Sequence, residues 1–212
     1  MIPAREALEA LREGNRRFVG DLSHDAGRSS IRRRVLPADQ DPLAIILGCS
    51  DARVPAEIVF DQGLGDLFVI RVAGNIVAPS QVGSVEFAAE AFGTRLVVVL
   101  GHSSCGAVRA TLEQLVRPPR EQSRNLRSIV DRIRPAVEAL LERGPPRDPK
   151  TLETQAVRAN IRMSADHLRH GSAVLEQLIQ KDGLLVVGAE YSLETGVVDF
   201  FDGVPGGGRR GH

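Results

Sequence analysis

Short apolar runs recur along the chain, and segments with helical periodicity separate them. Four runs are rich in leucine, isoleucine and valine and are bounded by turn residues: 43–48, 67–74, 96–101 and 184–191. Continuous runs of this length are typical of strands that are covered on both faces of a sheet. A fifth run, 197–201, follows the turn sequence Ser-Leu-Glu-Thr-Gly, so we expect it to pair antiparallel with the fourth.

The intervals between the runs carry the pattern of amphipathic helices. Leu8, Leu11 and Phe18 repeat at helical spacing within 4–18. Strands that alternate with helices predict an α/β fold, with a mostly parallel central β-sheet flanked by helices and an antiparallel C-terminal edge strand. Further helices are expected over 80–92, 106–116, 122–143 (kinked or broken at Pro135) and 172–183. Another helix is expected to begin at Pro149 and to carry Val157, Ile161 and Leu168 on one face.

We expect the 212 residues to form a single domain. Residues 1–42 are predicted to hold an N-terminal helix and an extended arm, and the glycine-rich residues 203–212 a flexible tail. A chain of this length buries about two thirds of its unfolded surface, so it needs no disulfides to fold.

Charge and hydropathy narrow the range of partners and compartments. Lys and Arg number 27 and Asp and Glu number 27, so the formal net charge of zero argues against a nucleic-acid partner. The longest apolar runs fall far short of the roughly 18 residues of a membrane helix, so we expect no membrane association. Residues 1–18 are charged throughout and lack the apolar core of a signal peptide, which predicts a cytoplasmic protein.

Three metal-ligand side chains follow two of the predicted strands. Cys49 comes directly after the first run, and His102 and Cys105 follow the third. If these two strands are neighbours, the three side chains converge at one edge of the sheet, where parallel α/β sheets bind ligands. Two thiolates and one imidazole form a catalytic zinc set that leaves a fourth position for water. The alternative is two small buried cysteines and a loop histidine.

A carboxylate and a guanidinium lie close to the first of these cysteines. Asp51 and Arg53 are expected on the same side of an extended segment as Cys49. They could form an ordinary ion pair, or they could position a metal-bound hydroxide.

Four motifs in this order and spacing resemble the β-class carbonic anhydrases. The resemblance implies that Cys49, His102 and Cys105 bind one Zn²⁺ and that Asp51 and Arg53 are the catalytic pair. It also implies a homodimer, or a multiple of dimers, with the active sites at the dimer interface. The motifs are CSDARVP (49–55), DQGLGDLFVIRVAGN (61–75), GSVEFAAE (83–90) and VVVLGHSSCGAV (97–108).

The implied reaction is the reversible hydration of carbon dioxide to bicarbonate and a proton. An ionised Asp51 can only accept hydrogen bonds, so it would orient zinc-bound hydroxide while Arg53 holds it in place. The backbone N–H of Gly106, near a helix start, would donate to bicarbonate oxygens. In a closed state, Asp51 would instead bind zinc as the fourth ligand.

Members of the family that bicarbonate inhibits at a second site use a Trp, an Arg and a Tyr there. The aligned positions hold Ile46, Arg71 and Phe87, so the resemblance implies that this inhibitory pocket is absent. The substrate-side glutamine of the family aligns with Gly63, one position after Gln62.

Two other functions fit the same ligands. One is a hydrolase of carbonyl sulfide or carbon disulfide on the same scaffold, and the other is a non-catalytic, zinc-stabilised scaffold or sensor that Asp51 closes permanently.

Overall fold

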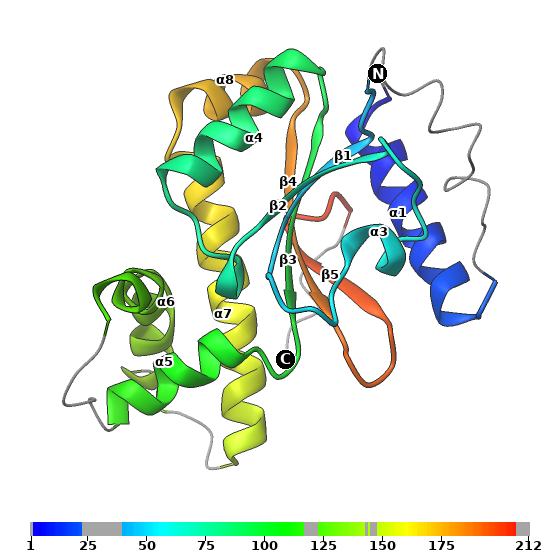
Figure 1. Cartoon of the computed structure of the whole chain (residues 1–212). Helices are drawn as coiled ribbons and strands as arrows, with labels where there is room; N and C mark the ends of the chain where they lie inside the picture. Colours follow the sequence, from blue (N-terminus) through cyan, green and yellow to red (C-terminus); the bar gives the residue numbers. More distant parts are fainter. Residues whose placement is uncertain (1, 23–39, 117–122, 143, 145–147, 207–212) are drawn as a thin grey trace.

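The five predicted strands form one twisted sheet in the computed structural model, which describes residues 2–22, 40–116, 123–142, 144 and 148–206. The strand order is β2-β1-β3-β4-β5 (Figure 1). The first four strands run parallel and β5 is antiparallel to β4, which confirms the predicted fold class. The bounds are β1 Ala44–Gly48, β2 Leu67–Arg71, β3 Leu96–His102, β4 Leu185–Tyr191 and β5 Val198–Asp202.

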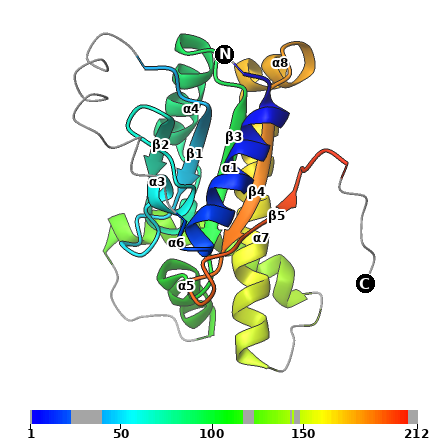
Figure 2. The ribbon, with the colours of Figure 1, turned by 90° about the vertical axis from the view of Figure 1, so that its right-hand side faces the viewer.

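Helices cover both faces of the sheet (Figures 1 and 2). Helices α1 (Ala4–Val19) and α3 (Ala56–Val59) lie on one face. The other face carries the longer set: α4 (Pro79–Ala91), α5 (Gly106–Val116), α6 (Arg124–Glu142), α7 (Pro149–His170) and α8 (Ala173–Lys181).

The core has two parts because alternate strand residues point to opposite faces. Ile45 and Val97 belong to the part under α4–α8, and Ile46 and Val98 belong to the part under α1 and α3. All four side chains are fully buried. This burial on both faces explains why the strands read as unbroken apolar runs.

The second strand is shorter than the sequence indicated. It ends at Arg71, and a 3₁₀ turn, η3 (Ala73–Asn75), replaces its predicted last residues. Gly74 and Asn75 both have positive φ, 71° and 43°. A strand cannot continue through two left-handed residues, so the chain turns here beneath the end of the sheet.

The predicted break at Pro135 does not interrupt α6, which runs from Arg124 to Glu142. Pro135 cannot donate to the carbonyl of Asp131. Its position is solvent-exposed, so water can bond the carbonyl that proline leaves without its helical donor.

Helix α1 is joined to the sheet by one buried amide. Nδ2 of Asn15 donates to the carbonyls of Val59 (3.1 Å) and Gly196 (2.9 Å), and its Oδ1 accepts from the N–H of Val198 (2.9 Å). The N-terminal helix therefore packs on its own chain's sheet, beside α3 and β5.

Part of the predicted organisation lies outside the described residues: most of the arm, at 23–39, and the end of the tail, at 207–212. The single-domain assignment stays a prediction. Within the described ranges, no helix has the length and apolar character needed to cross a bilayer.

Candidate metal centre

Cys49, His102 and Cys105 meet at the carboxyl edge of the sheet. Cys49 follows β1 directly, His102 is the last residue of β3, and Cys105 precedes α5. Because β1 and β3 are adjacent and parallel, their ends lie together. The two sulfurs and a ring nitrogen of His102 lie within 4.8 Å of one another, and all three residues are buried. The structure thus brings together the three ligands that the sequence indicated.

His102 is oriented by its backbone neighbour. Its Nδ1 lies 2.9 Å from the carbonyl of Ser103, so the ring proton is assigned to Nδ1. Ser103 is itself fixed, because its N–H donates to the carbonyl of Tyr191 and its Oγ accepts from the N–H of Leu193. Nε2 is buried and has no hydrogen-bond partner among the described residues. A neutral imidazole with one nitrogen held in this way presents the other as a metal ligand.

The two thiols share one proton. A hydrogen bond from the Cys105 thiol lowers the pKa of Cys49 to about 4, although burial opposes the shift. The same bond, together with burial, raises the pKa of Cys105 well above its ordinary value. Burial lowers the pKa of His102, but the adjoining Cys49 sulfur, together with Ser103 and Asp51, outweighs burial and raises the pKa above its ordinary value. Cys49 is therefore a thiolate, whose negative charge a cation bound at the cluster would neutralise.

Backbone N–H groups surround both sulfurs. The N–H of Gly74 lies 3.3 Å from Sγ of Cys49, and the N–H groups of Ala107 and Val108 in the first turn of α5 lower the pKa of Cys105. Donors of this kind stabilise thiolates. Two thiolates and an unbonded imidazole nitrogen are a donor set that suits Zn²⁺, so the residues present fit this metal.

The side chains of Asp51 and Arg53 form a bidentate ion pair beside the cluster. Nε and Nη2 of Arg53 donate to Oδ1 and Oδ2 of Asp51 at 2.9 and 2.7 Å. The side-chain hydrogen bonds from Arg53 hold the pKa of the Asp51 carboxyl well below its usual range. Oδ2 also lies 3.8 Å from Nε2 of His102. The carboxylate is therefore ionised and borders the buried ligands.

The segment that carries this pair is a turn, which corrects the expected extended conformation. The N–H of Arg53 donates to Oδ1 of Asp51 at 3.0 Å, and the N–H of Val54 donates to the Asp51 carbonyl at 3.0 Å. An aspartate that accepts from the backbone two residues on favours this turn. Asp51 therefore orients its own backbone as well as its partner's side chain.

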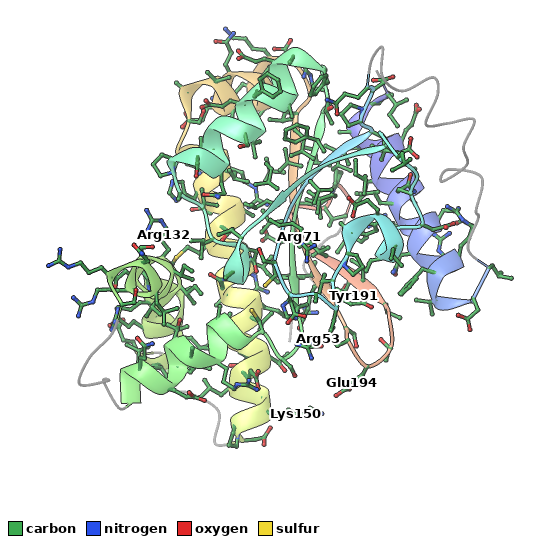
Figure 3. The ribbon with its side chains drawn as sticks, in the orientation of Figure 1. Arg53, Arg71, Arg132, Lys150, Tyr191 and Glu194 are labelled. Atoms are coloured by element: carbon green, nitrogen blue, oxygen red, sulfur yellow. The ribbon has the colours of Figure 1, made fainter. Side chains whose placement is uncertain are left out.

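Arg71 contributes to the site in a way that the sequence analysis did not predict. Its Nε donates to the carbonyl of Cys49 at 3.2 Å, and its Nη2 donates to the carbonyl of Asp51 at 2.8 Å. Figure 3 shows Arg71 and Arg53 toward the same end of the sheet. One side chain at the end of β2 thus holds both ends of the segment that carries a ligand and the acidic residue.

Four further positions have distinct surroundings. Gly106 is the exposed first residue of α5, and a Cβ there would meet nothing within 4 Å. Ile46 is fully buried in β1, whereas Phe87 is 56% exposed and packs against Phe68 and Phe92. Gln62 donates to the carbonyl of Phe60 at 2.8 Å. The predicted role of Gly106 and the predicted absence of a second bicarbonate site stay predictions.

Two cysteines and a histidine at the carboxyl edge of an α/β sheet could hold a metal ion, and comparison with known proteins identifies the family. The family described as Carbonic anhydrase matches residues 44–198. Carbonic anhydrase 2 of Mycobacterium tuberculosis (strain H37Rv) is 38% identical over 190 residues, which cover 90% of this chain and 89% of that protein. The carbonic anhydrase of Mycolicibacterium smegmatis is 38% identical over 193 residues, 91% of each chain.

Solved structures have the same fold. A β-carbonic anhydrase of Aspergillus fumigatus gives a TM-score of 0.70 at 24% identity and covers 93% of this chain and 91% of its own. Tetrameric β-carbonic anhydrases from Sordaria macrospora give a TM-score of 0.73 at 20% identity, and the match covers 92% of this chain and 97% of theirs. The chain belongs to the β-class carbonic anhydrases, which are carbonate dehydratases, enzymes of the lyase class.

Proposed function

We propose that this protein catalyses the reversible hydration of carbon dioxide to bicarbonate and a proton, with one Zn²⁺ held by Cys49, His102 and Cys105. The observation that carries the proposal is the burial of two sulfurs and one unbonded imidazole nitrogen within 4.8 Å of one another. Family membership supports the reaction, and the donor set supports zinc.

The metal would supply hydroxide as a nucleophile near neutral pH, less readily with two thiolate ligands than with three imidazoles, so activity should rise toward alkaline pH. Asp51 is ionised and can only accept hydrogen bonds. It would accept the single proton of the nucleophile and thereby turn a lone pair toward carbon dioxide. Arg53 and Arg71 keep Asp51 in place. The N–H of Gly106 would donate to the oxygens of the product.

The pairing of Asp51 with Arg53 supports a catalytic role over permanent closure. In a closed state, Asp51 would leave Arg53 and become a fourth metal ligand. Both carboxylate oxygens accept from Arg53 in this structure. Release of Asp51 would break two charge-assisted hydrogen bonds, so the arrangement favours the open state.

We also propose that the protein is a single domain that assembles as a homodimer or a multiple of dimers in the cytoplasm. Structural relatives from Sordaria macrospora are tetrameric, and Phe87 is an exposed large apolar residue. Both cysteines are free thiols, which suits a reducing compartment. Light scattering coupled to gel filtration measures the assembly, and a mass of one chain would contradict it.

Stopped-flow measurement of carbon dioxide hydration with zinc-loaded protein tests the proposed reaction. We expect activity between about pH 7 and 9 that increases with pH. Parallel assays with carbonyl sulfide and carbon disulfide test the alternative substrates. Zinc-loaded protein without carbon dioxide hydration, but with hydrolysis of either sulfur compound, would contradict the proposal.

A further inference from the structure

The η3 turn connects the Cys49 sulfur to helix α7. The backbone N–H of Gly74 donates to Sγ of Cys49 at 3.3 Å, and the carbonyl of Gly74 accepts from Nδ2 of Asn160 at 2.8 Å. Both hydrogen bonds are buried. The two peptide groups that flank a single Cα atom thus link a thiolate of the metal centre to a side chain 86 residues further along the chain.

Local sterics alone do not hold this turn. Gly74 has φ 71° and ψ 21°, and Asn75 has φ 43°. A left-handed residue with a side chain is strained, and glycine has more backbone freedom than any other residue. Contacts from the surrounding structure must therefore keep the Gly74 peptides in this orientation.

Helices α5 and α6 restrict the position of Gly74 but not the direction of its peptide groups. A Cβ on Gly74 would lie 2.8 Å from Cδ1 of Ile133 and 3.0 Å from Cβ of Ala107, so the backbone packs closely against both. Van der Waals packing of this kind is not directional, whereas a hydrogen bond is. The Gly74–Asn75 peptide makes two directional contacts: its N–H donates to the carbonyl of Val72 at 3.1 Å within the turn, and its carbonyl accepts from Asn160. The hydrogen bond from Asn160 is the one that ties this peptide to α7.

Asn160 is a polar residue on an otherwise mainly apolar face. The buried face of α7 includes Ala156, Val157 and Ile161, and Asn160 is only 1% exposed. A buried amide is costly unless it is hydrogen-bonded. Because α7 packs on the sheet, the side chain of Asn160 has a fixed position from which it bonds the η3 turn.

We propose that Asn160 is a positioning residue for the metal centre: by holding the carbonyl of Gly74, it directs the Gly74 N–H at the Cys49 sulfur. The inference rests on the proposed metal site and not on the identity of the substrate. An N–H donor reduces the charge on a thiolate and fixes its orientation, and loss of a group that orients a metal ligand typically lowers metal affinity about 10–100-fold.

Asn15 provides a matched control. Its amide is also buried, at 5% exposure, and makes three hydrogen bonds to backbone groups. Those partners, Val59, Gly196 and Val198, belong to the opposite face of the sheet and to the β4–β5 hairpin. Asn15→Ala therefore removes the same chemical group and destabilises the fold without breaking the link to Cys49.

The experiment compares Asn160→Ala with Asn15→Ala in three measurements. A chromophoric chelator in competition gives the zinc dissociation constant, the Co²⁺ form gives the sulfur-to-metal charge-transfer band, and urea gives the stability of metal-free protein. We expect Asn160→Ala to weaken zinc binding about tenfold or more and to shift the Co²⁺ band. Asn15→Ala should lose stability while its Co²⁺ band stays at the wild-type position.

Each outcome decides between the explanations. An Asn160→Ala protein with wild-type affinity and spectrum overturns the inference, and so does an affinity loss that both variants share in proportion to their stability. If Asn160→Ala does not fold, Asn160→Ser and Asn15→Ser undergo the same comparison with the same expectations. Wild-type protein that binds neither metal contradicts the proposed function itself, which separates the two failures.

Discussion

Arg53 donates hydrogen bonds to both carboxylate oxygens of Asp51, at 2.9 Å from Nε to Oδ1 and 2.7 Å from Nη2 to Oδ2. The pair lies beside buried ligands, with Oδ2 only 3.8 Å from Nε2 of His102. An ionised carboxylate in this position would, in the proposed reaction, accept the proton of the nucleophile. The pair therefore lies where a residue that acts on the proposed nucleophile would have to be.

Asp51→Asn should lower kcat/KM for carbon dioxide hydration by about 100-fold or more while zinc remains bound. The amide keeps the shape of the side chain but loses the charge and offers a donor in place of an acceptor, and a group that handles a reacting proton typically contributes 10²–10⁴-fold. Stopped-flow kinetics and metal analysis on the same preparation measure both quantities.

Asp202→Asn is the matched control, because Asp202 pairs with Arg169 at 2.7 Å and is not part of the cluster. It should retain wild-type kcat/KM. A non-catalytic scaffold closed by Asp51 makes the opposite prediction, since Asp51→Asn would then leave activity at zero or create it.

Gly106→Pro should lower kcat/KM about tenfold or more, whereas Gly106→Ala should stay close to wild type. Gly106 is the first residue of α5, where proline fits a helix, and proline removes the N–H that we propose as a donor to the product. The alanine Cβ meets no atom within 4 Å. Equal kinetics of the two variants would remove Gly106 from the substrate contacts.

Arg71→Lys should lower kcat/KM about tenfold with little change in zinc content. Arginine spans the carbonyls of Cys49 and Asp51 with two donors on one planar group, and a lysine ammonium cannot reproduce this geometry. Arg132→Lys, on α6, is the control and should keep the wild-type kcat/KM. If both variants behave alike in stopped-flow assays, Arg71 does not hold the segment that carries Asp51.

The Asp51–Arg53 pair should also lower the free energy of unfolding when the pH becomes acidic. The pKa of Asp51 is lower in the folded protein than its unfolded value near 3.8, so the unfolded chain binds the proton more tightly. The stabilisation is complete above the unfolded pKa and is lost as the pH falls below it. Urea unfolding of metal-free wild type and Asp51→Asn should give a constant difference above about pH 5 that shrinks toward pH 3. A difference that grows on acidification would contradict this sign.

The sequence predicted the parts of the fold that periodicity controls. Apolar runs such as 96–101 indicated the strands, and the adjacency of β1 and β3 then brought Cys49 to His102 and Cys105. Ligands that follow strands directly can be placed in this way because a strand end has a defined position in the sheet.

The sequence analysis could not predict features that depend on contacts between distant segments. The strand that begins at Leu67 read as apolar up to Gly74, but positive φ at Gly74 and Asn75 ends it early. The sequence analysis placed Arg71 only at a position of the second bicarbonate site that it predicts to be absent, because the two backbone acceptors of Arg71 lie 22 and 20 residues away in the sequence. In the sequence, Asn160 stands out from its neighbours on the buried face of α7 only because it is polar. Its partner Gly74 lies far away in the sequence.

X-ray absorption at the zinc edge of purified, zinc-loaded protein tests the central claim most directly. Two sulfur ligands at about 2.3 Å, with nitrogen or oxygen ligands near 2.0 Å, are predicted for one Zn²⁺ held by Cys49, His102 and Cys105. Cys105→Ser should show at most one sulfur ligand and should lose most of its zinc affinity. A zinc ion without sulfur ligands in the wild type, or folded protein that binds no stoichiometric zinc, would contradict the account.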